Sequence, residues 1–152
     1  MNKEISFGAA FSHHAHRRGD ALAIVCGNDS ITWREFDCGA NRLARAFAEH
    51  GAKQGDYLAI LRPNSIDMLQ AIAAAWKIGA VPTPLPFTAT DSERQALLSV
   101  VNPALVYAGG STNVCSFNLF AADQNLQISF SGEALPECEA PYLRALCSGG
   151  SS

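Results

Sequence analysis

The chain has 152 residues and a formal net charge of −3, a length that suits one domain or subdomain with a sizeable core. Hydrophobic residues make up 48% and charged residues only 16%, below the roughly 25% charged residues usual in soluble domains. This composition predicts a surface that is partly covered by something else. The slightly acidic balance gives no support to a nucleic-acid or anionic-membrane partner.

The five cysteines indicate a reducing compartment. They are odd in number and nowhere approach a Cys-x-x-Cys spacing, which argues against a disulfide framework and against a zinc knuckle. The first residues lack the apolar core of a signal peptide. The most apolar stretch, Met68–Ile78, is interrupted by Gln70 and Lys77 and is too short to span a bilayer. We therefore expect a cytoplasmic protein without a membrane span.

The chain begins with a predicted helix and a predicted hairpin. Ser6–Arg18 is expected to be helical and to end at Gly19. Ala21–Cys26 has the composition of a strand, and Gly27–Asp29 has that of a turn. Ser30–Thr32 would then return as the second arm of the hairpin.

Thr32 begins the clearest helix of the sequence. Thr32 and Glu35 have the spacing of a capping box, in which each side chain bonds the backbone of the other residue. Gly51 is expected to end this helix. The apolar positions fall on one stripe at helical spacing: Phe36, Ala40, Leu43, Ala44 and Phe47. We expect the opposite face to be solvated, and it carries Arg34, Asn41, Arg45 and Glu49.

The middle of the chain alternates short strands with helices. Asp56–Leu61 is predicted as a strand, after which Ser65 caps a helix that runs to Ile78. This helix is apolar nearly all round, so it is expected to be buried. Prolines at alternate positions in Pro82–Pro86 exclude a central strand and predict an extended segment at the rim of a sheet.

The same alternation continues toward the C-terminus. Asp91 or Thr90 is expected to cap a helix over Ser92–Val101, and strands are predicted at Ala104–Ala108 and Leu126–Phe130. Strands and helices in this order predict an α/β fold with a parallel-type sheet flanked by helices. Ligands in such folds bind at the carboxyl ends of the strands.

The last five residues form a loop of small residues after the strand-like run Tyr142–Cys147. A Gly/Ser loop lets backbone N–H groups curl around an anion. The candidate phosphate-binding residues are Ser148, Gly149, Gly150, Ser151 and Ser152. Taken alone, a terminal Gly/Ser run is more often a flexible end or a linker.

Other clusters of reactive side chains give no catalytic or metal site. The histidines of His13–His16 lack a carboxylate or cysteine at ligand spacing, so they are expected to form a solvated helix end. Cys147 is interpreted as a buried structural thiol rather than a nucleophile. Trp76 is interpreted as a core residue, and Lys77 as a lysine whose ammonium reaches out to solvent. The sequence contains neither G-x-S-x-G nor G-x-G-x-x-G.

Three segments have the order and composition of motifs in a known family. Ile31–Phe36 is similar to an opening motif (L/I)-T-(Y/W)-x-E-(L/F). Ile60–Leu85 resembles a P-N turn, a buried helix and a (K/R)-x-G-A-V-x-x-P-L segment. Ser148–Ser152 resembles the start of the phosphate loop S-G-(G/S/T)-(S/T)-(S/T)-G-x-P-K. Together they resemble the N-terminal part of adenylate-forming (AMP-binding) enzymes, most closely the acyl-CoA synthetases. This context favours the phosphate loop over a linker.

The resemblance implies a two-step reaction. A carboxylate would attack the α-phosphate of ATP to give an acyl-adenylate and pyrophosphate, and the thiol of coenzyme A would then displace AMP. The implied cofactors are ATP, Mg²⁺ and coenzyme A, and the implied substrate is a fatty, aryl, or steroid or bile acid. The loop Ser148–Ser152 would neutralise the charge of the β- and γ-phosphates.

The resemblance also implies that residues 1–152 are the N-terminal fragment of the AMP-binding large domain, ending inside the phosphate loop. The remainder of the same polypeptide would be its partner. We expect no catalytic residue and no metal ligand in this fragment, which should be inactive alone because a partial loop cannot position ATP against a carboxylate. Two alternatives stay open: an adenylation domain that loads a carrier protein, and a stand-alone, non-catalytic α/β binding module.

Overall fold

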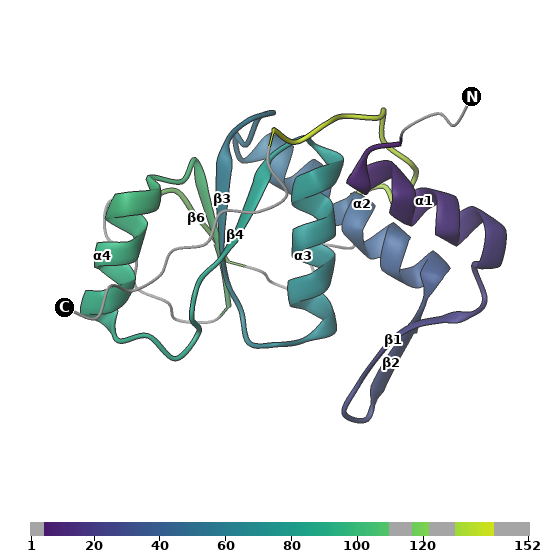
Figure 1. Ribbon diagram of the computed structural model, residues 1–152, viewed down its shortest axis with the longest axis horizontal. Coiled ribbons are helices and arrows are strands. Elements are labelled where there is room, and N and C mark those ends of the chain that lie inside the picture. The colour runs from purple at the N-terminus through teal and green to yellow at the C-terminus, as the bar shows by residue number, and fades with distance from the viewer. Residues whose placement is uncertain (1–4, 110–116, 122–129, 142–152) are drawn as a thin grey trace.

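A computed structural model describes residues 5–109, 117–121 and 130–141. A sheet stands between two unequal helical layers (Figure 1). Helix α4 (Asp91–Val101) covers one face, and helices α2 (Trp33–Glu49) and α3 (Ile66–Lys77) cover the other. Helix α1 (Phe7–Arg18) lies outside α2 and α3.

The main sheet has four strands in the order β4-β3-β5-β6. Their bounds are Tyr57–Leu61 (β3), Val81–Pro84 (β4), Leu105–Ala108 (β5) and Leu119–Ala121 (β6). The three pairings are all parallel, which confirms the predicted α/β fold with a parallel sheet flanked by helices. β3 and β5 are the central strands and are apolar along almost their whole length, as strands covered on both faces must be.

Two details of the sheet test the sequence predictions. The proline-containing strand β4 lies at the edge, as the alternate prolines predict. The short edge strand β6 was not predicted. Of the strand expected at Leu126–Phe130, only Phe130 lies within the described residues, and it lies in a bend.

The N-terminal elements form as the sequence predicts. Ser6 caps α1, and its side chain accepts a hydrogen bond from the backbone N–H of Ala9. Strands β1 (Leu22–Cys26) and β2 (Asp29–Thr32) pair antiparallel as a separate two-stranded hairpin. This hairpin projects from the helical layer beside α2 and α3 (Figure 1).

Helix α2 has the predicted capping box, with Thr32 and Glu35 bonding each other's backbone. These hydrogen bonds stabilise the Glu35 carboxylate and hold its pKa below the ordinary value. The prediction for the opposite face was wrong in part. Asn41 is buried rather than solvated, because its amide donates hydrogen bonds to Asp37 and to the carbonyl of Gly132.

Helix α4 begins with a second capping box, formed by Thr90 and Glu93. It ends at Asn102, whose φ of 47° and ψ of 57° lie in the left-handed region. Its one fully buried side chain, Leu98, packs on the sheet face formed by Ala59, Leu61 and Val106. Pro103 follows and cannot continue the helix.

The larger core lies between the sheet and helices α2 and α3. Phe47 of α2 meets Tyr107 of β5 edge to face, with ring centroids 5.2 Å apart, and Phe120 of β6 extends this aromatic cluster. Aliphatic side chains of both layers complete it: Leu43, Leu58, Ile60 and Leu105. Removing a side chain of this kind costs about 2–5 kcal/mol, so this core fixes the helices against the strands.

Candidate functional site at the carboxyl edge of the sheet

The connections of the sheet make one edge the natural place for a ligand. The chain passes from β3 through α3 to β4, which lies on one side of β3. It then passes from β4 through α4 to β5, which lies on the other side of β3. The chain order therefore changes direction between β3 and β5. In open α/β sheets, ligands bind outside the carboxyl ends of the strands at such a switch point.

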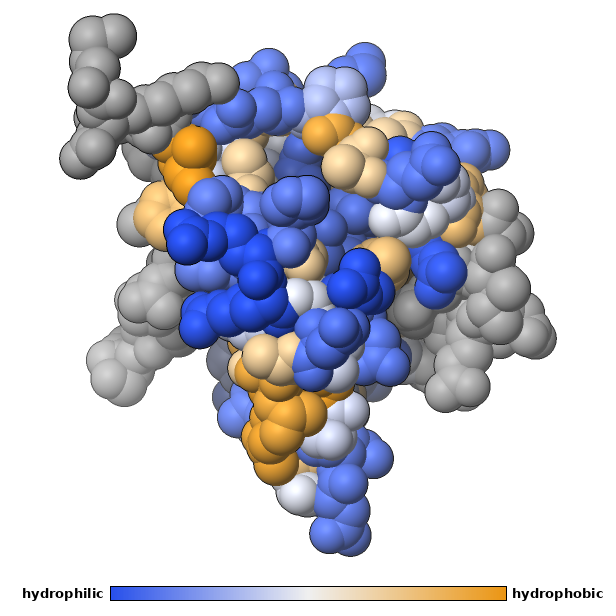
Figure 2. Space-filling model, turned by 90° about the vertical axis from the view of Figure 1, so that its right-hand side faces the viewer, coloured by the Kyte–Doolittle hydropathy of each residue, from blue (hydrophilic) through white to orange (hydrophobic). Residues whose placement is uncertain are grey.

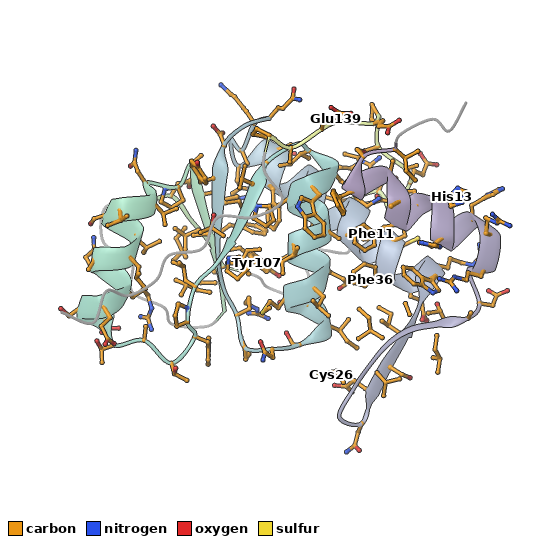
Figure 3. All side chains as sticks on the ribbon, viewed as in Figure 1. Phe11, His13, Cys26, Phe36, Tyr107 and Glu139 are labelled. Atoms are coloured by element: carbon orange, nitrogen blue, oxygen red, sulfur yellow. The ribbon has the colours of Figure 1, made fainter. Side chains whose placement is uncertain are left out.

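A cluster of three polar side chains lies at this switch point. Asp67, in the first turn of α3, accepts a hydrogen bond from the Tyr107 hydroxyl at 2.7 Å. Its second oxygen accepts from Nε of Arg62 at 2.6 Å, and the Arg62 guanidinium lies 5.5 Å from the centroid of the Tyr107 ring. Figure 3 shows Tyr107 within the sheet, between the helical layers. This cluster was not predicted from the sequence, although the position of Arg62 directly after a buried strand is a signal that could have indicated it.

A second polar network joins the three helices on one side of the sheet. Nζ of Lys77 lies 2.8 Å from Oδ1 of Asp37 and donates to the Ser12 hydroxyl at 2.7 Å. Ser12 donates in turn to Asp37. The prediction that the Lys77 ammonium reaches solvent was wrong. The side chain is buried because Asp37 and Ser12 bind its ammonium. Its neighbour Trp76 is only partly buried. Because these contacts join α1, α2 and α3, we assign the network a structural role.

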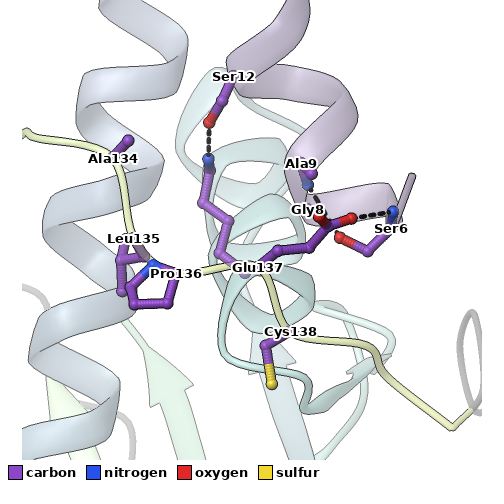
Figure 4. A pocket seen from close by; sticks show the side chains of 10 residues that line it. Ser6, Gly8, Ala9, Ser12, Ala134, Leu135, Pro136, Glu137 and Cys138 are labelled. Atoms are coloured by element: carbon purple, nitrogen blue, oxygen red, sulfur yellow. Dashed lines mark hydrogen bonds between the residues drawn. The ribbon is translucent and has the colours of Figure 1, made fainter. Parts of the chain in front are cut away.

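The segment 130–141 lies across these helices. Nη1 of Arg45 donates to the carbonyls of Ser131 and Glu133, and Glu137 accepts a hydrogen bond from the backbone N–H of Ser6. The segment 130–141, helix α1 and Lys77 together enclose a hollow of about 70 Å³ (Figure 4). This volume has room for about two water molecules. The hollow is too small for a nucleotide.

An apolar hollow of about 260 Å³ lies between the hairpin and the helices. Its lining includes Phe11, Ile24, Phe36 and Trp76. Leu22 and Val25 of the hairpin are more than 60% exposed, and Figure 2 shows apolar side chains gathered on the hairpin below a hydrophilic region. This is the exposed apolar surface that the low charge content predicts.

The remaining predicted site residues divide into two groups. The candidate phosphate loop, Ser148, Gly149, Gly150, Ser151 and Ser152, lies outside the described residues, as does Cys147. In the histidine segment, His13 and His16 are exposed, and the His14 ring packs 4.9 Å from the Trp33 ring. Among residues 5–109, 117–121 and 130–141, no three His, Cys, Asp or Glu side chains are grouped to hold a metal ion.

A comparison with protein families gives one match that covers most of the chain. The model described as "AMP-binding enzyme" matches residues 11–141. The chain belongs to this AMP-binding enzyme family. The predicted resemblance to adenylate-forming enzymes is therefore confirmed.

Curated relatives in the family are longer than this chain. Protein Y of Streptomyces griseus is 38% identical over 96 residues, which are 63% of this chain and 31% of Protein Y. The 2,3-dihydroxybenzoate-AMP ligase of Bacillus subtilis is 36% identical over 77 residues, which are 51% of this chain and 14% of the ligase. The chain thus spans less than a third of either relative.

Two solved structures have the same fold as this chain. The N-terminal domain of FACL13 from Mycobacterium tuberculosis has a TM-score of 0.78 at 21% identity, covering 88% of this chain and 38% of that one. The nonribosomal peptide synthetase FmoA3 has a TM-score of 0.82 at 18% identity, covering 90% of this chain and 15% of that one. At these identities the similarity establishes the fold alone. In the part of this family member that the structure describes, no helix is long and apolar enough to cross a bilayer.

Proposed function

We propose that this chain forms the first part of an enzyme that activates a carboxylic acid with ATP and transfers the acyl group to coenzyme A. The observation that carries the proposal is the family match over residues 11–141. The sequence order of three segments supports it, because they resemble three family motifs that occur in the same order: Ile31–Phe36, Ile60–Leu85 and Ser148–Ser152.

In the first step, a carboxylate oxygen of the acid forms a bond to the α-phosphorus of ATP, and the bond to the β-phosphate breaks to release pyrophosphate. In the second step, the thiol of coenzyme A loses its proton to solvent, its sulfur bonds to the acyl carbon, and AMP leaves with the electron pair of the broken C–O bond. The sequence of Ser148–Ser152 suits the first step, because its backbone N–H groups and hydroxyls are able to stabilise charge on the leaving pyrophosphate. Mg²⁺ accompanying ATP would offset further phosphate charge.

We further propose that residues 1–152 belong to the AMP-binding large domain and that the rest of that polypeptide covers part of their surface. The exposed apolar hairpin and hollow support this partner. The chain alone is expected to be inactive.

The proposed location is the cytoplasm, which agrees with the unpaired cysteines Cys26, Cys38 and Cys138. The acid is proposed to be a fatty, aryl, or steroid or bile acid.

A second candidate differs only in the acceptor of the acyl group. An adenylation domain would transfer it to a carrier-protein thiol instead of coenzyme A. The fold is shared with both the nonribosomal peptide synthetase FmoA3 and the FACL13 N-terminal domain, and it is compatible with either acceptor.

Exchange of radioactive pyrophosphate into ATP tests the shared first step. The assay uses the complete polypeptide that contains this chain, with panels of fatty, aryl, and steroid or bile acids. Exchange that depends on one acid class supports the proposal, and the absence of exchange with every class contradicts it. The double variant Ser151→Ala/Ser152→Ala should slow exchange, whereas Ser30→Ala on the exposed hairpin is the matched control. Formation of an acyl-CoA then separates the two acceptors.

A further inference from the structure

Arg62 is held in place by one side of its guanidinium only. Nε donates to Asp67, and within the described residues Nη1 and Nη2 have no hydrogen-bond partner. The side chain as a whole is 21% exposed, so it is not sealed inside the described core. An arginine oriented in this way presents its remaining N–H donors in a fixed plane, the geometry that suits phosphate oxygens.

The neighbouring backbone leaves room for this arrangement. Gly109 directly follows β5, and a Cβ atom at that position would overlap Nη1 of Arg62. The guanidinium therefore lies across the carboxyl end of β5, although Arg62 itself follows β3. It spans the two strands on either side of the switch point, where ligands of such sheets bind.

The ion pair with Asp67 does not remove the positive character of Arg62. Asp67 is also stabilised by the Tyr107 hydroxyl and by its place in the first turn of α3, where the helix dipole favours a negative charge. The carboxylate is thus shared between Arg62, the Tyr107 hydroxyl and the N-terminal end of α3. Its main effect on Arg62 is to fix the plane of the guanidinium.

We propose that Arg62 binds a phosphate group of a ligand at the switch point between β3 and β5, separately from the loop Ser148–Ser152. The choice of a phosphate over another anion rests on the proposed function, in which both ATP and coenzyme A carry phosphates. The position and orientation of the donors rest on the geometry alone. Arg62 is therefore a binding residue, whereas Asp67 and Tyr107 are positioning residues.

Titration of the 152-residue chain with pyrophosphate tests the proposal. Calorimetry gives the affinity, and NMR follows the Arg62 Nε–H and Gly109 amide signals. Arg62→Gln should weaken binding by about tenfold or more, the equivalent of about 1.4 kcal/mol. Arg34→Gln is the matched control, because Arg34 also pairs with an aspartate, Asp20, but far from the sheet edge; its affinity should stay within about twofold of the parent.

Two outcomes would overturn the proposal. One is an affinity of Arg62→Gln within about twofold of the parent chain, and the other is that pyrophosphate leaves the Arg62 and Gly109 signals unmoved. If Arg62→Gln does not fold, Arg62→Lys keeps the charge but loses the planar donors, and it should bind more weakly than the parent. Titrations with ATP and coenzyme A identify the source: dependence on Arg62 for either one supports the site. Acid-dependent pyrophosphate exchange by the parent polypeptide is measured separately, so an unchanged affinity of Arg62→Gln would overturn this site without contradicting the proposed function.

Discussion

Lys77 and Asp37 form an ion pair inside the helical layer, and their side chains are only 4% and 11% exposed. Because the pair joins α3 to α2, and Ser12 of α1 bonds both partners, three helices depend on it. Removing two charges from water has a large desolvation cost. This cost is offset because each of the two charged groups contacts both the other and the Ser12 hydroxyl.

Asp37→Ala should therefore destabilise the chain by about 3–5 kcal/mol, since it leaves a buried ammonium without its counter-charge. The measurement is the free energy of unfolding in urea. Asp20→Ala is the control: it breaks the exposed pair with Arg34 and should cost at most about 1 kcal/mol. Equal losses for the two variants would show that Lys77 does not depend on Asp37.

Gly8→Ala should destabilise the chain by about 1–3 kcal/mol, although helix propensity alone would favour alanine by about 1 kcal/mol. A Cβ on Gly8 would lie 2.8 Å from Cα of Lys77, so α1 would have to move away from α3. Gly39→Ala is the comparison, because its Cβ would meet the amide end of Gln70, which is able to rotate. A thermal-unfolding midpoint for Gly8→Ala at or above that of the parent would contradict the close contact.

Glu35 makes the stability of α2 depend on pH. Hydrogen bonds from the backbone and side chain of Thr32 hold the pKa of Glu35 below its ordinary value. A depressed folded-state pKa stabilises the fold above the unfolded-state pKa of about 4.3, and this contribution is lost as pH falls through the lower folded-state pKa.

Glu35→Gln should therefore lower the unfolding midpoint at pH 7 and have progressively less effect as the pH is lowered toward about 2, because the parent carboxylate takes up a proton as the pH passes its lowered folded-state pKa. Glu93→Gln should behave in the same way, because Thr90 lowers the pKa of Glu93 through the same contacts. Unfolding midpoints measured between these two pH values check both variants. A difference from the parent that does not change with pH would refute the role of the charge.

Asn102 ends α4 in the left-handed region, and its backbone N–H donates to the carbonyl of Leu98 at 2.8 Å. Asn102→Gly should leave stability unchanged or slightly increased, because glycine adopts this conformation without steric cost. Asn102→Val should cost about 1–2 kcal/mol, since a β-branched side chain is strained there. Equal stability of the two variants would place the end of α4 elsewhere.

Local patterns predicted the elements well because their signals lie within a few residues. Both capping boxes, the hairpin turn and the prolines of β4 each depend on neighbours along the chain. Alternating strands and helices then sufficed for the parallel sheet, since parallel strands need a crossover between them.

The errors arose where partners are distant in sequence. Lys77 and Asn41 look like surface residues on their own helices. Lys77 is buried because it meets Asp37 and Ser12, and Asn41 because it also bonds the distant carbonyl of Gly132. The cluster of Arg62, Asp67 and Tyr107 likewise requires the register of β3 against β5. The three-residue strand β6 has too short a pattern to be distinguished from a loop.

The prolines of β4 decide on which side this sheet accepts a neighbour. The N–H groups of Val81 and Leu85 point toward β3, where they donate to Asp56 and Ile60. Residues between them alternate in direction, so Pro82 and Pro84 occupy the positions whose N–H groups would point outward. Proline has no N–H group, and the outer side of β4 therefore lacks the donors that an incoming strand would need. A chain with so much exposed apolar surface is thereby protected from edge-to-edge aggregation along this strand.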